Sequence, residues 1–186
     1  MRLEVRLAGF GGQGIISAGL MLAAAACIHD GRNAVQTRSY GPESRGGACK
    51  SEVVISDGEI DFPTVTEPDV LIVMSQEAYN TYVNTVKKRG TLLLDSDLVA
   101  KEKVTSHIRV FRVPATRIAE EVGKTLVANV VMLGALTPIT NVVSVKSMRN
   151  SILSAIPGGT EKLNLEAFKR GYDYGKQFLE KEASEN

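Results

Sequence analysis

The sequence predicts an α/β fold in which a doubly wound, largely parallel sheet carries helices on both faces. Strand-like and helix-like segments alternate along the chain, and parallel strands need helical crossovers between them. Residues 69–75, Asp-Val-Leu-Ile-Val-Met-Ser, form the continuous apolar run that is typical of a strand buried on both faces. The chain also opens with a strand, a glycine-rich turn and an apolar helix, as Rossmann-like folds do.

The opening unit carries the most specific local pattern. Residues 3–7 alternate apolar and polar side chains and predict the first strand. Gly9, Gly11 and Gly14 follow with the spacing G-x-G-x-x-G, and residues 15–28 are an apolar run of helical length. Glycine permits a tight turn and lets a ligand approach the backbone, and a helix N-terminus attracts anions.

The turn is therefore a candidate site for a phosphate or another anion. Its candidate ligand contacts are Gly11, Gly12, Gln13 and Gly14. The alternative is that these glycines serve only the tight strand-to-helix turn, and the sequence leaves both interpretations open.

A second glycine-rich segment follows the second strand. Residues 33–39 are strand-like, and residues 39–48, Ser-Tyr-Gly-Pro-Glu-Ser-Arg-Gly-Gly-Ala, are too polar and too interrupted to form an element. Residues 49–56 predict the next strand, and Asp57-Gly58 predicts a turn after it.

The middle of the chain continues the alternation. Residues 76–88 predict a helix whose basic end, Lys87-Lys88-Arg89, suits the negative pole of the helix dipole. Residues 91–95 and residues 108–113 predict two more strands. Asp95 and Asp97 directly follow the first of these, where a turn or capping role is expected, although the pair could also serve as a general acid and base.

The C-terminal third is helical in character. The expected helices cover residues 115–122, 127–136 (ending before Pro138), 144–156 and 164–182. No linker or internal repeat interrupts the pattern, so residues 1–186 are expected to form a single domain.

Composition excludes several classes of function. The 186 residues carry a formal net charge of +1, so no global field recruits nucleic acid or an anionic membrane. Two cysteines and two histidines are too few for an iron–sulfur cluster with four thiolates, and we read no zinc site. Cys27 is expected in the core, and Cys49 is expected at a strand and partly exposed. Since no secretory leader or membrane span is recognisable, we expect a cytoplasmic protein.

The two glycine-rich loops should meet at one rim of the sheet. Ligands of open α/β sheets bind beyond the carboxyl ends of the strands, where both loops begin, so Arg38 and Arg45 are candidate anion contacts. An NAD site would need Asp or Glu at the end of the second strand, where this chain has Gln36-Thr37-Arg38. This argues against NAD, whereas an arginine is compatible with a ribose phosphate; solvated loop charges are the alternative.

We identify no catalytic residue and no metal ligand. His29 is expected at a helix end and His107 just before a strand, and no serine, histidine and acid set can be assembled around them. A domain with a nucleotide-like rim and no catalytic group is best understood as a subunit that assists other chains.

Two motifs make this interpretation specific. The segments Gly9-Phe10-Gly11-Gly12-Gln13-Gly14 and Tyr40-Gly41-Pro42-Glu43-Ser44-Arg45-Gly46-Gly47 together resemble the gamma subunit of 2-oxoacid:ferredoxin oxidoreductases. The strands at residues 51–56 and 69–75 and the helix at residues 129–136 match as well, so the resemblance covers essentially the whole chain. The Gly46-Gly47 ending and the small size are most similar to the 2-oxoglutarate type.

The resemblance implies an activity that resides mainly on other chains. Such complexes oxidatively decarboxylate a 2-oxoacid with coenzyme A to an acyl-CoA, carbon dioxide and reduced ferredoxin. Thiamine diphosphate and magnesium are then expected between alpha and beta subunits, and iron–sulfur clusters on beta or on a small ferredoxin-like delta subunit. The gamma subunit would bind no cofactor alone, and in fused relatives its counterpart is implicated in coenzyme A binding.

The two lines of reasoning combine into one hypothesis. The N–H groups of residues 11–14, with Arg38 or Arg45, would hold the phosphates of coenzyme A, which is a shared substrate. Three alternatives stay open: a purely architectural subunit whose residues 40–47 dock on alpha and beta, an NADP-binding oxidoreductase domain, and the beta chain of an indolepyruvate:ferredoxin oxidoreductase.

Overall fold

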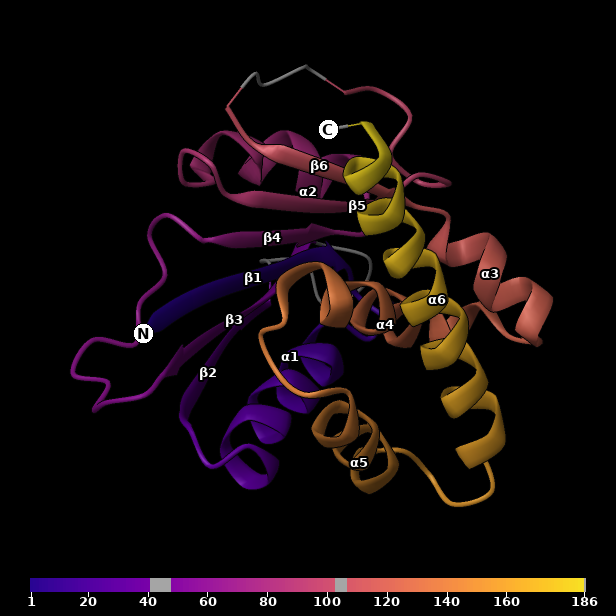
Figure 1. Ribbon diagram of the computed structural model, residues 1–186, viewed down its shortest axis with the longest axis horizontal. Helices are drawn as coiled ribbons and strands as arrows, with labels where there is room; N and C mark the ends of the chain where they lie inside the picture. Colours follow the sequence, from indigo (N-terminus) through magenta and orange to yellow (C-terminus); the bar gives the residue numbers. More distant parts are fainter. Residues whose placement is uncertain (41–47, 103–106, 186) are drawn as a thin grey trace.

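The computed structural model describes residues 1–40, 48–102 and 107–185, and it contains one six-stranded sheet (Figure 1). The strand order is β2-β3-β1-β4-β5-β6. The strands are β1 (Arg2–Phe10), β2 (Asn33–Tyr40), β3 (Ala48–Ser56), β4 (Val70–Val73), β5 (Thr91–Asp95) and β6 (Arg109–Val113).

Five strands run in one direction and β3 runs against them. The pairs β1–β4, β4–β5 and β5–β6 are parallel, whereas β3 is antiparallel to both β1 and β2. After the short turn at Asp57-Gly58, the next strand does not pair with β3. Instead, residues 59–69 lead to β4 on the other side of β1. The prediction of a doubly wound, largely parallel α/β sheet is confirmed.

Helices cover both faces of the sheet, also as predicted. One face packs against α1 (Ile15–Ala24), α3 (Ala115–Val122), α4 (Ala128–Thr140), α5 (Val145–Ala155) and α6 (Glu161–Glu185). The opposite face packs against α2 (Gln76–Tyr82), which contacts β1 and β4. Side chains alternate between the two cores along each strand: Leu7 and Ile72 enter the first core, and Ala8 and Val73 enter the second.

Two predicted helix ends are wrong, and packing explains the first. Helix α4 continues through Pro138 to Thr140 instead of ending before the proline. The ring removes only one N–H bond in the last turn, and Pro138 packs so tightly on α6 that a Cβ on Gly175 would lie 2.9 Å from its Cγ. Asn141, in the left-handed conformation at φ 49°, then ends the helix.

Helix α2 is shorter than predicted. It ends at Tyr82 and a 3₁₀ turn continues to Thr85, so the basic triplet lies beyond the helix terminus and does not complement its dipole. The chain turns there to enter β5. Lys87 donates its backbone N–H to Pro68 O and its Nζ to Asp69, and Arg89 adopts φ 65° while its N–H bonds to His107 O.

The expected burial of Cys27 and the expected partial exposure of Cys49 are wrong, whereas the strand position of Cys49 is confirmed. Helix α1 runs into a π-helical turn, Ala25–His29, and this wider turn leaves Cys27 exposed although Ala25 and Ala26 are buried. Cys49 is buried in β3, where the residues that alternate with Lys50 and Glu52 face the α1 core.

Asp30 joins the end of the first helix to α5. Its carboxylate accepts hydrogen bonds from Ser144 N (2.8 Å) and Ser147 Oγ (2.6 Å), while Ser144 itself caps α5. Burial raises the pKa of Asp30, but the hydrogen bonds from Ser147 and Ser144 and the charge of Arg32 outweigh burial. The net pKa therefore lies below the ordinary value of 3.8.

Replacing Asp30 by asparagine should lower the free energy of unfolding by about 1 kcal/mol at pH 7, because a charge-assisted cap is lost. Since the folded pKa is depressed, this contribution is present above pH 3.8 and disappears as the pH falls through the folded pKa. Urea unfolding of wild type and variant at pH 7 and pH 3 measures both effects. The exposed Asp61→Asn variant is the control, and a difference that stays constant with pH would contradict this account.

Candidate functional site

The glycine turn between β1 and α1 requires glycine at two positions. Gly12 has φ 96° and Gly14, the N-cap of α1, has φ 73°, and L-residues rarely adopt either value. A Cβ on Gly14 would also collide with the side-chain amide of Asn129. Gly11 and Gly12 are exposed, so the backbone of the turn is open to solvent at the start of α1. This is the position at which the positive end of a helix dipole favours an anion.

Gln13 holds the turn together from inside. Its Oε1 accepts the Phe10 N–H at 2.6 Å, and its Nε2 donates to Met74 O at the end of β4, also at 2.6 Å. Both ends of the side-chain amide are therefore engaged within the protein. The backbone N–H of Gln13 is engaged as well, because it donates to Phe10 O at 3.3 Å, so the structure does not favour the ligand contact from Gln13 that the sequence predicts.

Asn129 supports the turn from the C-terminal half of the chain, and the sequence analysis gave it no role at the site. Its Nδ2 donates to Gly14 O at 3.1 Å from the start of α4. Residues 127–136 contain a single polar side chain, Asn129, and buried amides require partners. That isolated amide was the available signal, but it could not indicate which backbone group, 115 residues away, it would bind.

Strand register brings the start of the glycine turn and the end of β2 to one rim of the sheet. Gly9 of β1 pairs with Cys49 of β3, and Cys49 pairs with Tyr40 of β2. The glycine turn and the segment after β2 therefore begin at the same level, two strands apart, which is about 10 Å. A phosphate-bearing ligand could span this distance.

Only one of the two candidate arginines, Arg38, lies within the described residues. Arg38 is exposed and lies on the α1 side of β2, since Gln36, two residues earlier, donates to Ile16 O in α1 at 2.9 Å. Arg45 lies outside the described residues, as do residues 41–47 of the second motif. No Asp or Glu occurs at the end of β2.

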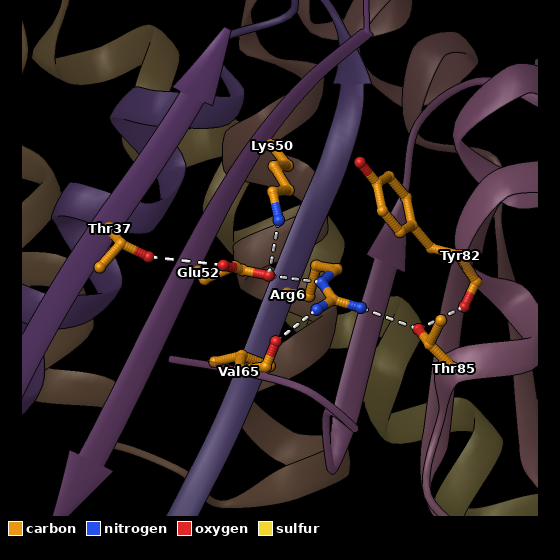
Figure 2. Close-up of polar contacts among 7 residues, drawn as sticks. All are labelled: Arg6, Thr37, Lys50, Glu52, Val65, Tyr82 and Thr85. Carbon is orange, nitrogen blue, oxygen red and sulfur yellow. Dashed lines mark hydrogen bonds and ion pairs between the residues drawn. The ribbon is translucent and has the colours of Figure 1, made fainter. Parts of the chain in front are cut away.

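On the opposite face of the sheet, β1 carries a buried ion pair that sequence reasoning missed (Figure 2). Arg6 is one of the polar residues that alternate with apolar ones in β1, yet its side chain is 6% exposed and that of Glu52 is 8% exposed. Arg6 Nε donates to Glu52 Oε1 at 2.7 Å. Residues 59–69 and the end of α2 cover this part of the sheet, which explains the burial.

Arg6 connects three parts of the chain in this network. Its guanidinium also donates to Val65 O (2.6 Å) and Thr85 Oγ1 (2.8 Å), and it lies over the ring of Tyr82, 5.2 Å from its centroid (Figure 2). Glu52 accepts further contacts from Lys50 and Thr37. Among the described residues, no buried side-chain nitrogen or oxygen of this cluster lacks a hydrogen-bond partner, so its arrangement is that of a structural support and not of a ligand site.

Asp95 and Asp97 have the predicted turn and capping role. Asp95 accepts hydrogen bonds from Asp97 N, Thr116 N and Thr116 Oγ1, and Asp97 accepts one from Arg117 N. Together they hold the first turn of α3. Burial raises the pKa of Asp95, and the hydrogen bonds from Thr116 oppose that rise.

Two further findings concern metals and membranes. Within residues 1–40, 48–102 and 107–185, no three His, Cys, Asp or Glu side chains are grouped so that they could hold a metal ion. No helix in the described part of the chain combines the length and the apolar character needed to cross a bilayer.

Comparison with known proteins identifies relatives along nearly the whole chain. The chain is 54% identical to the 2-oxoglutarate synthase subunit KorC of Methanocaldococcus jannaschii, over 95% of this chain and 96% of the relative. The gamma subunit of a keto/oxoacid ferredoxin oxidoreductase from Geobacter sulfurreducens has the same fold, with a TM-score of 0.87 and 43% identity over 95% of this chain and 98% of that one.

A larger relative contains the fold as one part. The 2-oxoglutarate:ferredoxin oxidoreductase from Magnetococcus marinus, solved with 2-oxoglutarate, coenzyme A and succinyl-CoA bound, has a TM-score of 0.86 and 26% identity. The match covers 95% of this chain and 31% of that chain. Residues 4–174 match the family described as Pyruvate ferredoxin/flavodoxin oxidoreductase. The chain therefore belongs to the pyruvate ferredoxin/flavodoxin oxidoreductase family.

Proposed function

We propose that the chain is the gamma subunit of a 2-oxoglutarate:ferredoxin oxidoreductase complex. The complex converts 2-oxoglutarate and coenzyme A to succinyl-CoA and carbon dioxide and reduces ferredoxin. The observation that carries this proposal is 54% identity to a 2-oxoglutarate synthase subunit over 95% of the chain. The fold and the length agree with this assignment, because the match to the Geobacter sulfurreducens gamma subunit covers 95% of this chain and 98% of that one.

In this proposal the catalytic cofactors are held by partner chains. Thiamine diphosphate and magnesium belong to the alpha and beta subunits, and iron–sulfur clusters belong to beta or to a ferredoxin-like delta subunit. The gamma subunit is inactive alone, and we place the assembled complex in the cytoplasm. The two cysteines agree with this division, since Cys49 is buried in β3 and Cys27 lies apart from it in the π-helical turn after α1.

We further propose that this chain helps to bind coenzyme A. The exposed backbone of Gly11 and Gly12, at the start of α1, would accept one phosphate, and Arg38 or Arg45 would pair with another. The shared rim of the two glycine-rich segments supports this arrangement. The relative with coenzyme A bound shares the fold over 95% of this chain.

The assignment is tested by purification from native extract. The tagged chain should capture alpha and beta chains, and the eluate should reduce a viologen dye only with both 2-oxoglutarate and coenzyme A. A preference for aryl pyruvates would identify an indolepyruvate enzyme instead. A chain that is captured alone and binds NADPH would overturn the proposal in favour of a dinucleotide-binding domain.

The coenzyme A contact is tested by substitution in the assembled complex. Replacing Arg38 or Arg45 by alanine should raise the apparent KM for coenzyme A about tenfold, because a charge-assisted hydrogen bond to phosphate is lost. The KM for 2-oxoglutarate should not change. Arg149→Ala, an exposed arginine of α5, is the matched control.

Two results would contradict the coenzyme A contact. One is an unchanged coenzyme A dependence in both variants. The other is dissociation of the complex with unaltered coenzyme A affinity, which would support the purely architectural subunit.

A further inference from the structure

The outward side of α1 lacks the polar character of an ordinary surface helix. Residues 15–28 contain no charged side chain. The inward side is buried, but Leu20 on the outward side is 53% exposed and Ile28 is 73% exposed. Apart from the exposed Ser17, the helix is apolar on all sides, which is typical of a protein interior and not of a surface exposed to water.

The exposed apolar residues lie along one side of the helix. Exposed Leu20 and Ile28 are each four residues from the partly buried Ala24 between them. The π-helical turn Ala25–His29 adds Cys27 to the same exposed end while keeping Ala25 and Ala26 buried. π-helical turns are frequent at functional positions.

An open sheet edge lies beside this stripe. Strand β2 is an outer strand, paired only with β3 in the described sheet, and α1 packs on it through the hydrogen bond from Gln36 to Ile16 O. Proteins usually protect such edges with several charges, but β2 carries only Arg38. Figure 1 shows α1 and β2 together at the margin of the molecule. We call Leu20, Ala24, Cys27, Ile28 and strand β2 the α1–β2 face.

We propose that the α1–β2 face is the surface by which this chain docks permanently on a partner subunit of the oxidoreductase complex. The partner is the chain that corresponds to the remainder of the longer Magnetococcus marinus polypeptide, of which the match covers 31%. In that relative a domain of this fold is covalently joined to its neighbours. A separate subunit must replace the covalent connection by a permanent interface.

The chemistry of the α1–β2 face fits such an occupant. Permanent interfaces resemble a protein core cut in two and exclude charge from their centre, which describes the stripe on α1. The open edge of β2 can pair with a strand or extended segment of the partner. This inference rests on the proposed function, because that function supplies the partner.

Cys27 reports directly on the docking, and Cys49 is an internal control. A small maleimide should modify Cys27 readily in the isolated chain, because it is exposed, whereas buried Cys49 should react slowly. In the purified complex the rate at Cys27 should fall about tenfold or more, since interface cores are closed to solvent. Peptide mass spectrometry quantifies both adducts in the same sample.

Substitutions provide a second measurement. Leu20→Arg and Ile28→Arg should leave the isolated chain folded, judged by circular dichroism and melting temperature, but abolish its co-purification with the oxidoreductase chains. Phe62→Arg is the matched control, because Phe62 is 63% exposed and lies between β3 and β4, away from α1. This variant should assemble like wild type.

The outcomes separate this inference from the proposed function. If the active complex forms but Cys27 keeps its reactivity, or both arginine variants assemble, the inference is overturned and the proposed function stands. Protection of Cys27 that rises with the concentration of the isolated chain would identify a second copy as the occupant and also overturn it. If wild type captures no oxidoreductase chain, the proposed function itself fails.

Discussion

Replacing Arg6 by leucine should lower the free energy of unfolding by about 3–5 kcal/mol, because it leaves the buried carboxylate of Glu52 without its main counter-charge. The same change removes the donors to Val65 O and Thr85 Oγ1, which join residues 59–69 and the end of α2 to β1. Lys50 remains 3.2 Å from Glu52 and offsets part of the loss, although it is more exposed than Arg6. Urea unfolding at pH 7 measures the change.

A second substitution distinguishes lost charge pairing from lost packing. Arg6→Leu combined with Glu52→Leu removes both buried charges, so the double variant should be more stable than Arg6→Leu alone. Arg6→Lys keeps the charge but has no planar fork to reach three acceptors, and it should fall between wild type and the leucine variant. A loss below about 1 kcal/mol for Arg6→Leu, the range of exposed pairs, would contradict the importance of this network.

Replacing Gly171 by alanine should destabilise the protein by about 1–3 kcal/mol, because the added methyl group has no room between α4 and α6. A Cβ there would collide with the backbone carbonyl of Val131, which cannot rotate away as a side chain can. Gly134 faces the backbone of α6 in the same way, so the two helices cross at a point where both backbones approach closely. The gain in helix propensity from alanine, about 1 kcal/mol, opposes the clash and does not remove it.

A matched glycine separates the clash from the intrinsic effect of the substitution. Gly158 has open space where a Cβ would lie and no positive φ, so Gly158→Ala should change the free energy of unfolding by less than about 0.5 kcal/mol. Thermal and urea unfolding of both variants provide the comparison. Equal stability of the two would show that α4 and α6 can separate at no cost, contrary to the close crossing described here.

Much of the fold could be predicted from local patterns. The apolar run before Ser75 and the segment at Thr91–Asp95 identified central strands, since only strands buried on both faces lack alternation. The direction of β3 could not be predicted, because alternation in residues 49–56 is the same for parallel and antiparallel pairing. The sheet order then depended on which side of β1 the chain took after Asp57-Gly58, a tertiary choice.

For the candidate site, too, local features could be predicted and long-range contacts could not. The spacing of Gly9, Gly11 and Gly14 predicted the turn and its helix, because a local backbone conformation needs glycine locally. The support from Asn129 could not be predicted in detail, since a hydrogen bond across 115 residues leaves no local periodicity. The burial of Arg6 could not be predicted for a related reason: strand alternation indicates which face a residue occupies, but not what covers that face.

The sequence by itself determined the α/β class, the glycine turn and the resemblance to the oxidoreductase gamma subunits. These features depend on short-range backbone preferences and on side-chain periodicity, which can be read along the chain. The tertiary structure alone decided that Gln13 and Asn129 hold the turn, that Arg6 and Glu52 are buried together, and that α1 exposes an apolar stripe beside an open strand. Each of these depends on which distant segments exclude water from a residue, and burial of that kind is a property of the assembled fold.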